Sequence, residues 1–253
     1  MRTARRILLP ALLLAALVGA WQIAASSGAI ADALNLEPTL VPSPAEVANA
    51  LWQNRSVLWE NSWVTLREIL LGIAAGVLAG IALAVAMRFS DLLRDAVFPL
   101  TVALQAVPVV VLAPILVIWF NYGIWPKVII VAIACFFPIV VATLDGLRAV
   151  DPEAVKMMRT LDASRWAIFR RVEAPTALPS FFSGAKIAVA IAPVVALFAE
   201  LAGANSGLML LITQANNSFR EALVFAAVTV LAVIGVLLVG LTALAQRLVV
   251  HWR

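Results

Sequence analysis

Long apolar runs are the feature of this sequence that most restricts its fold. A helix that crosses a bilayer needs about 20 mostly apolar residues. An open sheet cannot cross, because each unpaired backbone group in lipid costs several kcal/mol, and the strands of a barrel would alternate in polarity, which these runs do not. The sequence therefore predicts an all-α integral membrane protein with six transmembrane helices. They are expected at about 7–25, 63–87, 96–120, 127–144, 182–203 and 223–247.

The composition leads to the same class of protein. The chain is 64% hydrophobic and 13% charged, whereas soluble domains are about half apolar and a quarter charged. A net charge of +4 would suggest nucleic acid in a soluble protein, but here the basic residues lie between apolar runs. We therefore expect the lipid bilayer, and no nucleic acid, as a partner. The single Cys135 and single His251 exclude an internal disulfide, a cysteine-based metal cluster and a histidine-dependent site in the membrane.

The distribution of Lys and Arg predicts the orientation. With six spans, 14 of the 18 basic residues fall on the side that carries both termini. The positive-inside rule makes that side cytoplasmic. It includes the segment 145–181, whereas the loop 26–61 is expected outside. Residues 1–6 could begin a cleaved signal peptide, but the next apolar stretch is long enough to span and no clear cleavage site precedes Ser26, which favours a retained first span.

The segment 151–180 is the most charged part of the second half. Asp151-Pro152-Glu153 predicts a helix start, with a capping Asp, Pro at the first position and an acid in the first turn. This helix is expected to run to about Leu161. Asp162 then ends it and could cap a second short helix, Ala163–Val172, which Pro175 and Pro179 would stop before the fifth span.

This segment has two interpretations. In the second helix Trp166, Phe169 and Val172 fall on one face at three-residue spacing. An amphipathic loop resting on lipid headgroups would have this pattern. The alternative is a docking element that offers these side chains, with Met157 and Met158, to a groove on a soluble partner.

The loop also carries a pattern, Asp-Pro-Glu-x5-Arg-Thr-Leu-x-Ala-Ser-Arg-Trp-x-Ile-Phe-Arg-Arg-Val-x-x-Pro-x-x-Leu-Pro. It resembles the cytoplasmic loop of binding-protein-dependent ABC importer permeases, in the branch that serves nitrate, sulfonates, taurine and pyrimidine-type vitamin precursors. LQAVPVVVLAPILVIWFNYG (104–123), FFPIVVATLDGLRAVDPE (136–153) and KIAVAIAPVVALFAELAGANSGL (186–208) are similar to its third, fourth and fifth spans. The resemblance covers roughly 60–250.

The resemblance implies a type I ABC importer permease fold, with cytoplasmic coupling helices that sit in a cleft of the ATPase. This chain departs from the family at Lys156-Met157-Met158, where Glu-Ala-Ala is usual, and at Asp162, where Gly is usual. Asp tolerates a left-handed backbone better than most residues. The expected coupling residues are Asp151, Glu153, Met157, Met158, Arg159, Leu161, Asp162, Ala163, Ser164, Arg165, Trp166 and Phe169.

The resemblance also implies partners and a place in the cell. The sequence has no P-loop, so the chain is not expected to be an enzyme or to bind a cofactor; two separate ATPase subunits would hold ATP and magnesium. A second permease copy, most simply in a homodimer, and an extracytoplasmic solute-binding protein complete the importer in the bacterial inner (plasma) membrane. Residues 1–60 would form an N-terminal span and external loop. Residues 61–250 would form the transmembrane domain, with its coupling loop at 145–181.

The solute and the driving force have alternatives. The Met-Met-Arg form of the loop, with Phe-Phe-Pro-Ile, resembles the pyrimidine- and riboflavin-precursor permeases more than the sulfonate, taurine or nitrate ones, and this resemblance implies a pyrimidine/thiamine-precursor or riboflavin-precursor solute. A rival class is a secondary transporter with Glu200 or Glu68 as its proton site, against which no inverted repeat is found. A non-transporting membrane scaffold is the third hypothesis.

Polar or helix-breaking residues inside the spans are the candidates for the substrate pathway. Alternatives stand beside several of them: Glu200 could pair with solvent or Lys127 at the outer interface, Glu68 could pair locally with Arg67, and Trp119 fits an aromatic belt. Packing is the alternative for the phenylalanines, and for the Gly76-x-x-x-Gly80 pair. A half-buried external helix is expected within 204–222. The pathway candidates are Gln105, Pro108, Trp119, Asn121, Phe136, Phe137 and Glu200.

Overall fold

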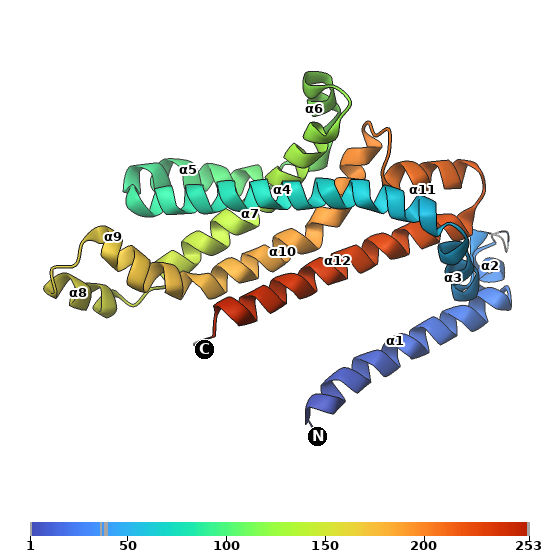
Figure 1. Ribbon diagram of the computed structural model, residues 1–253, viewed down its shortest axis with the longest axis horizontal. Coiled ribbons are helices and arrows are strands. Elements are labelled where there is room, and N and C mark those ends of the chain that lie inside the picture. Colours follow the sequence, from blue (N-terminus) through green and yellow to red (C-terminus); the bar gives the residue numbers. More distant parts are fainter. Residues whose placement is uncertain (1, 36, 38–39, 252–253) are drawn as a thin grey trace.

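The structure is a computed structural model that describes residues 2–35, 37 and 40–251. Every regular element in these residues is a helix. Figure 1 shows an elongated bundle of long helices with short helices gathered at both ends. The long helices are α4 (Arg55–Phe89), α7 (Ile124–Arg148), α10 (Ala174–Leu201) and α12 (Glu221–Val249). The prediction of an all-α protein is confirmed.

The described residues contain four helices long and apolar enough to cross a membrane, or five if one bent pair counts as a span. The first span expected from the sequence, at 7–25, falls in α1 (Arg2–Ser26), which is not among these four helices. The apolar part of α1 that the structure describes is Leu12–Ser26, which is shorter than a span. The side chains of 1–7 lie outside the described residues, as does Arg253, which is also counted in the predicted orientation. That first span therefore stays a prediction.

The third expected span, at 96–120, is a bent pair of helices. The chain forms α5 (Asp91–Leu104), a 3₁₀ turn η2 (Val109–Leu112) and α6 (Ala113–Phe120), and the two halves meet at 88°. Pro108 stands at the break and has no N–H to continue a helix, so the expected disruption becomes a full change of direction.

The core of the bundle is α7, which packs between α4 and α10. Its apolar stretch is 56% buried, against 22% for α12. Glycines make this close approach feasible: a Cβ added at Gly76 of α4 would lie 2.6 Å from the carbonyl oxygen of Ala132, and one at Gly184 of α10 would lie 2.5 Å from that of Pro138. The packing interpretation of the small-residue pair in α4 is thus confirmed.

Short helices occupy both ends of the bundle (Figure 1). One end holds α2 (Ala29–Leu34), α3 (Pro44–Gln53) and α11 (Leu208–Asn217), and the other holds α8 (Pro152–Thr160) and α9 (Arg165–Ile168). A capping box fixes the start of α3, where the backbone N–H of Ser43 donates to the Glu46 carboxylate at 2.7 Å. The helix expected within 204–222 is α11, which is half-buried through Leu208, Leu211 and Ala215.

Candidate functional site

The first coupling helix, α8, begins as its sequence predicts. The Asp151 carboxylate accepts a hydrogen bond from the backbone N–H of Glu153 at 2.9 Å, and Pro152 takes the first helical position. The helix ends at Thr160, with Leu161 as its C-cap. The predicted range for this helix is confirmed to within a residue at its end.

The turn after α8 departs from the prediction in one respect. Asp162 adopts a left-handed backbone with φ of 56°, as expected for a residue that stands in place of glycine. However, Asp162 does not cap the second helix. Ser164 does so, since its extended backbone suits an N-cap and its hydroxyl accepts from the N–H of Ala167 at 3.2 Å.

The second coupling helix is shorter than Ala163–Val172 and does not stop before the fifth span. α9 ends at Ile168, passes into a π-helical turn over Phe169–Glu173 and continues directly as α10. Pro175, in the first turn of α10, and Pro179, inside that helix, are both accommodated without ending it. The coupling loop is consequently confined to about 149–173, instead of 145–181.

Large apolar side chains lie exposed on these two helices. Met157 and Leu161, one turn apart on α8, are 60% and 72% exposed, and Trp166 is 59% exposed. The Trp166 ring is also held in place, because it stacks on Phe169 with 5.2 Å between centroids and lies 6.2 Å from Phe89. Of the other predicted residues, Met158, Ala163 and Phe169 are half-buried. The exposed ones are Asp151, Glu153, Arg159, Asp162, Ser164 and Arg165.

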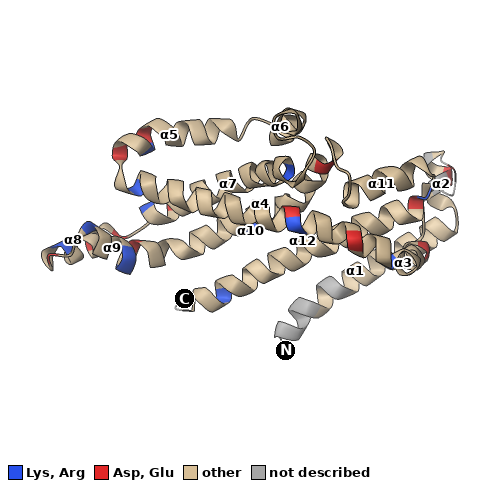
Figure 2. Cartoon of the chain, turned by 45° about the horizontal axis from the view of Figure 1, so that its top comes forward, with Lys and Arg blue, Asp and Glu red and all other residues tan. Residues whose placement is uncertain are grey.

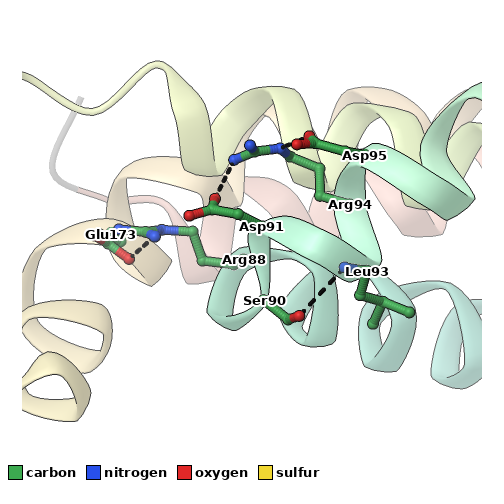
Figure 3. A network of polar contacts seen from close by, with 7 residues as sticks. All are labelled: Arg88, Ser90, Asp91, Leu93, Arg94, Asp95 and Glu173. Carbon is green, nitrogen blue, oxygen red and sulfur yellow. Dashed lines mark hydrogen bonds and ion pairs between the residues drawn. The ribbon is translucent and has the colours of Figure 1, made fainter.

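An ion pair that the sequence analysis missed anchors the loop at its exit. Arg88, at the end of α4, donates through Nε to Glu173 at 2.9 Å and through Nη2 to the second carboxylate oxygen (Figure 3). The Glu173 side chain is 3% exposed and that of Arg88 is 38% exposed. This bidentate geometry fixes the coupling loop to the end of α4.

Four of the pathway candidates lie on the bent pair. Gln105 is the C-cap of α5, Pro108 precedes η2, and Asn121 ends α6 with a positive φ of 61°. All three are exposed in the single chain, and Trp119 is 71% exposed. The bent pair therefore presents polar and aromatic groups on a surface that the rest of the chain leaves open.

The two phenylalanine candidates are packed into the bundle. Their rings contact each other edge to face at 5.4 Å between centroids. Phe137 is 8% exposed, while Phe136 packs against a cluster that includes Met87 and Leu144. These contacts favour packing as their role.

Glu200 is the centre of a buried polar network. Its side chain is 2% exposed, and its carboxylate accepts from the Thr65 hydroxyl and from the backbone N–H of Met209 at 2.8 Å. Gly207 has φ of 121° and packs directly on the carboxylate, where any Cβ would collide with it. Gly207, the N-cap of α11, has no side chain to accept a hydrogen bond from the first N–H groups of that helix. Glu200 of α10 supplies this acceptor instead, through its bond from the Met209 N–H.

This geometry predicts how Glu200 variants behave. Glu200→Leu leaves the Met209 N–H unpaired, at about 1–3 kcal/mol for a buried group, whereas the Thr65 hydroxyl keeps the Asn61 carbonyl as an acceptor at 3.2 Å. We expect a lower thermal midpoint of the detergent-purified chain, with a smaller loss for Glu200→Gln, which keeps one acceptor oxygen. A purely pathway role would instead lower uptake in both variants and leave their thermal midpoints at the wild-type value.

A buried ion pair inside the bundle joins Glu68 of α4 to Lys127 of α7, at 3.2 Å. Both side chains are buried, at 1% and 6% exposure. The predicted local pair of Glu68 with Arg67 is wrong, because Arg67 instead lies over the Trp63 ring at 5.0 Å. Lys127 therefore serves Glu68 rather than Glu200. Within the described residues no three His, Cys, Asp or Glu side chains group as metal ligands.

The fold, the apolar spans and the coupling loop define a multi-pass membrane permease. Residues 72–251 match the family described as "Binding-protein-dependent transport system inner membrane component", and the chain belongs to that family. Members work with a separate ATPase and a substrate-binding protein, so this chain is a transport subunit of an ABC importer and not an enzyme. This membership favours ATP-driven import over the gradient-driven and scaffold alternatives.

Several known proteins are similar to this chain. The formylaminopyrimidine transport permease ThiX of Halalkalibacterium halodurans is 34% identical over 86% of the chain and 87% of its own length. The riboflavin transport permease RibX of Chloroflexus aurantiacus is 35% identical over 85% and 81%. The taurine permease TauC of Escherichia coli is 30% identical over 84% and 80%. Among solved structures, the inward-facing MetNI methionine ABC transporter matches 79% of the chain and 97% of its own, with a TM-score of 0.62 at 18% identity. The type I importer permease fold is thereby confirmed.

Proposed function

We propose that this chain carries a pyrimidine-type thiamine precursor or a riboflavin-type solute across the membrane. Sulfonate, taurine and nitrate are the alternative solutes. The greater similarity to ThiX and RibX than to TauC supports this choice. So does the Met157-Met158-Arg159 form of the coupling loop.

The proposed importer is a homodimer of this chain with two ATPase subunits. Residues 61–250 form the transmembrane domain, residues 1–60 add an N-terminal span and external loop, and both termini are cytoplasmic. A binding protein delivers solute outside. The bent pair, with Gln105, Pro108, Trp119 and Asn121, lines the pathway, whereas the burial of Phe137 and Glu200 supports a structural role for those two.

The observation that carries the coupling role is the exposed apolar surface on α8 and α9. Met157, Leu161 and Trp166 are each at least 59% exposed, at the end of the bundle where basic residues gather (Figure 2). Apolar anchors at helical spacing are the means by which a short helix enters a groove on a partner. ATP-driven closure of the two ATPase subunits then moves residues 151–172. This movement switches the substrate cavity between the two permease copies from inward-open to outward-open.

Trp166→Ala tests this role in the reconstituted importer. Removing a central aromatic anchor typically costs at least about 2 kcal/mol of binding, or roughly 30-fold in affinity. We expect weaker recovery of the ATPase with the permease, and solute uptake that falls more than ATP hydrolysis does. Trp59→Ala is the matched control, because Trp59 is 72% exposed near the start of α4, away from α8 and α9. Normal coupled uptake by the Trp166 variant would exclude docking through this ring.

The solute is identified through the binding protein that co-purifies with the permease. Its thermal midpoint is measured with pyrimidines, flavins, taurine, aliphatic sulfonates and nitrate in parallel. A rise with an aminopyrimidine or a flavin alone is the expected result. A rise with taurine or a sulfonate alone would transfer the assignment to the alternative class.

A further inference from the structure

Two adjoining cavities lie between the coupling helices and the junction of α4 with α5. The first has a volume of about 160 Å³, and the second of about 190 Å³. They share Arg88, Val155 and Glu173 in their linings. The two cavities therefore adjoin at these three residues, and together they are called the recess beneath α8 and α9.

The recess has a strong excess of positive charge. Its basic lining residues are Arg88, Arg94, Arg148, Arg159 and Arg165, against the two carboxylates of Asp91 and Glu173. Both carboxylates are already occupied, since Glu173 pairs with Arg88, and Asp91 pairs with Arg94 at 2.6 Å (Figure 3).

The guanidinium groups of three of these arginines form no ion pair within the described residues. Arg148 lies over the Phe98 ring at 5.0 Å. Arg159 and Arg165 make no ion pair with any carboxylate in the described part of the chain. A recess with several uncompensated arginines is suited to an anion that presents more than one acceptor oxygen, because the guanidinium fork binds phosphate oxygens in pairs.

The position of the recess indicates where such an anion comes from. Val155 and Arg159, four residues apart, put it on one face of α8, whereas Met157 and Leu161 lie on the opposite face. The recess thus faces the bundle and not the surface proposed for the ATPase. It also lies where the apolar span of α4 ends, at Arg88 and Phe89, and the end of an apolar span is expected to lie among the lipid headgroups.

We propose that this recess binds the phosphate group of an anionic phospholipid, held by Arg159 and Arg165 of the first cavity, with Arg148 of the adjoining cavity adding positive charge. Basic pockets at the ends of membrane helices bind anionic headgroups in this way. The bound headgroup fastens α8 and α9 to the end of α4, so that lipid composition sets the position of the coupling loop. This inference does not depend on the identity of the solute. Its test uses the permease without the ATPase, because Arg159 and Arg165 are also among the expected coupling residues.

The test measures the thermal midpoint of the delipidated, full-length chain in detergent. It is titrated with dioctanoyl phosphatidylglycerol, with dioctanoyl phosphatidylcholine and with inorganic phosphate. We expect saturable stabilisation by phosphatidylglycerol alone. In the Arg159→Gln/Arg165→Gln variant the apparent affinity is expected to fall at least about tenfold, because charge-assisted hydrogen bonds to the phosphate are lost.

A matched double variant controls for net charge. Arg170→Gln/Arg171→Gln removes the same charge from the same segment, but these two exposed side chains line neither cavity. It should keep the wild-type affinity. Should the first variant not fold, Arg159→Lys/Arg165→Lys keeps the charge, removes the forks and is expected to bind severalfold more weakly.

Three outcomes would overturn the proposal. One is an unchanged affinity for phosphatidylglycerol in the Arg159→Gln/Arg165→Gln variant. If that variant does not fold, the same result in the Arg159→Lys/Arg165→Lys variant counts instead. A second is equal stabilisation by phosphatidylcholine, which means general solvation by lipid. The third is equal stabilisation by inorganic phosphate at matched concentration, which makes the recess a site for small soluble anions.

Discussion

Replacing Gly76 with leucine is expected to abolish accumulation of the folded permease. A Cβ at this position would lie 2.6 Å from the Ala132 carbonyl oxygen and 2.9 Å from the Cys135 Cβ. The obstacle on α7 is backbone, which cannot turn aside as a side chain can. Overpacking in a core typically costs about 1–3 kcal/mol. A leucine here costs more, because α4 and α7 must separate along their shared seam.

The seam repeats the same arrangement on either side of Gly76. Added Cβ atoms at Gly72 and Gly80 would meet Val131 and Ile139 of α7 at 2.5 and 2.7 Å. The contacts include the Cβ atoms of these two β-branched residues, which the backbone of α7 holds in place. Gly72→Ala and Gly80→Ala are therefore expected to be about as damaging as Gly76→Ala.

Size-exclusion chromatography of a fluorescently tagged chain measures this effect directly. Gly240→Leu is the matched control, because a Cβ at Gly240 of α12 would have no neighbour within 4 Å. The control should give a wild-type monodisperse peak, and Gly76→Leu should give aggregate or no protein. A monodisperse Gly76→Leu peak of normal height would show that α4 and α7 are not in close contact at this point.

This seam illustrates what the sequence could predict. Gly76 and Gly80 share one face of a helix by spacing alone, and the local signals at Asp151-Pro152-Glu153 set a helix start that the structure reproduces. Such features depend on residues within one or two turns of each other. The left-handed turn at Asp162 has a different source, because it is expected from the glycine that the family usually carries there, and Asp tolerates that backbone.

Features that depend on distant residues could not be predicted in this way. Lys127 pairs with Glu68 because the turn of α4 that carries Glu68 packs on the start of α7. Glu200 meets the start of α11 because Gly207 leaves that start without a capping side chain. The 88° bend of the third span also escaped prediction, since Pro108 marks a break but does not set its angle.

Arg88→Met is expected to destabilise the permease far more than Glu173→Leu. The two side chains form one bidentate pair, but their exposures are unequal, at 38% for Arg88 and 3% for Glu173. Without Arg88, a buried carboxylate remains uncompensated, at a cost of about 3–5 kcal/mol. Without Glu173, the arginine can extend its charged end to water or lipid headgroups, so the loss is smaller.

The double variant distinguishes the loss of the ion pair from the cost of leaving one charged partner behind. In Arg88→Met/Glu173→Leu no buried charge is left, and we expect its thermal midpoint to match Glu173→Leu and exceed that of Arg88→Met. At roughly 2–4 °C per kcal/mol for a chain of this size, Arg88→Met should lose at least about 6 °C. The coupling loop loses its tie to α4 in all three variants, so coupled uptake should fall in each.

Arg94→Met is the matched control for this cycle, since Arg94 also forms ion pairs and lies close by in Figure 3. Its partners Asp91 and Asp95 are 81% and 70% exposed, and exposed pairs contribute about 0–1 kcal/mol. The control should therefore shift the thermal midpoint little. If Arg88→Met shifts it no more than Arg94→Met does, water reaches Glu173 and the pair is not a buried anchor. A large loss in Arg88→Met that Glu173→Leu repairs would establish that the cost comes from the carboxylate left without its partner.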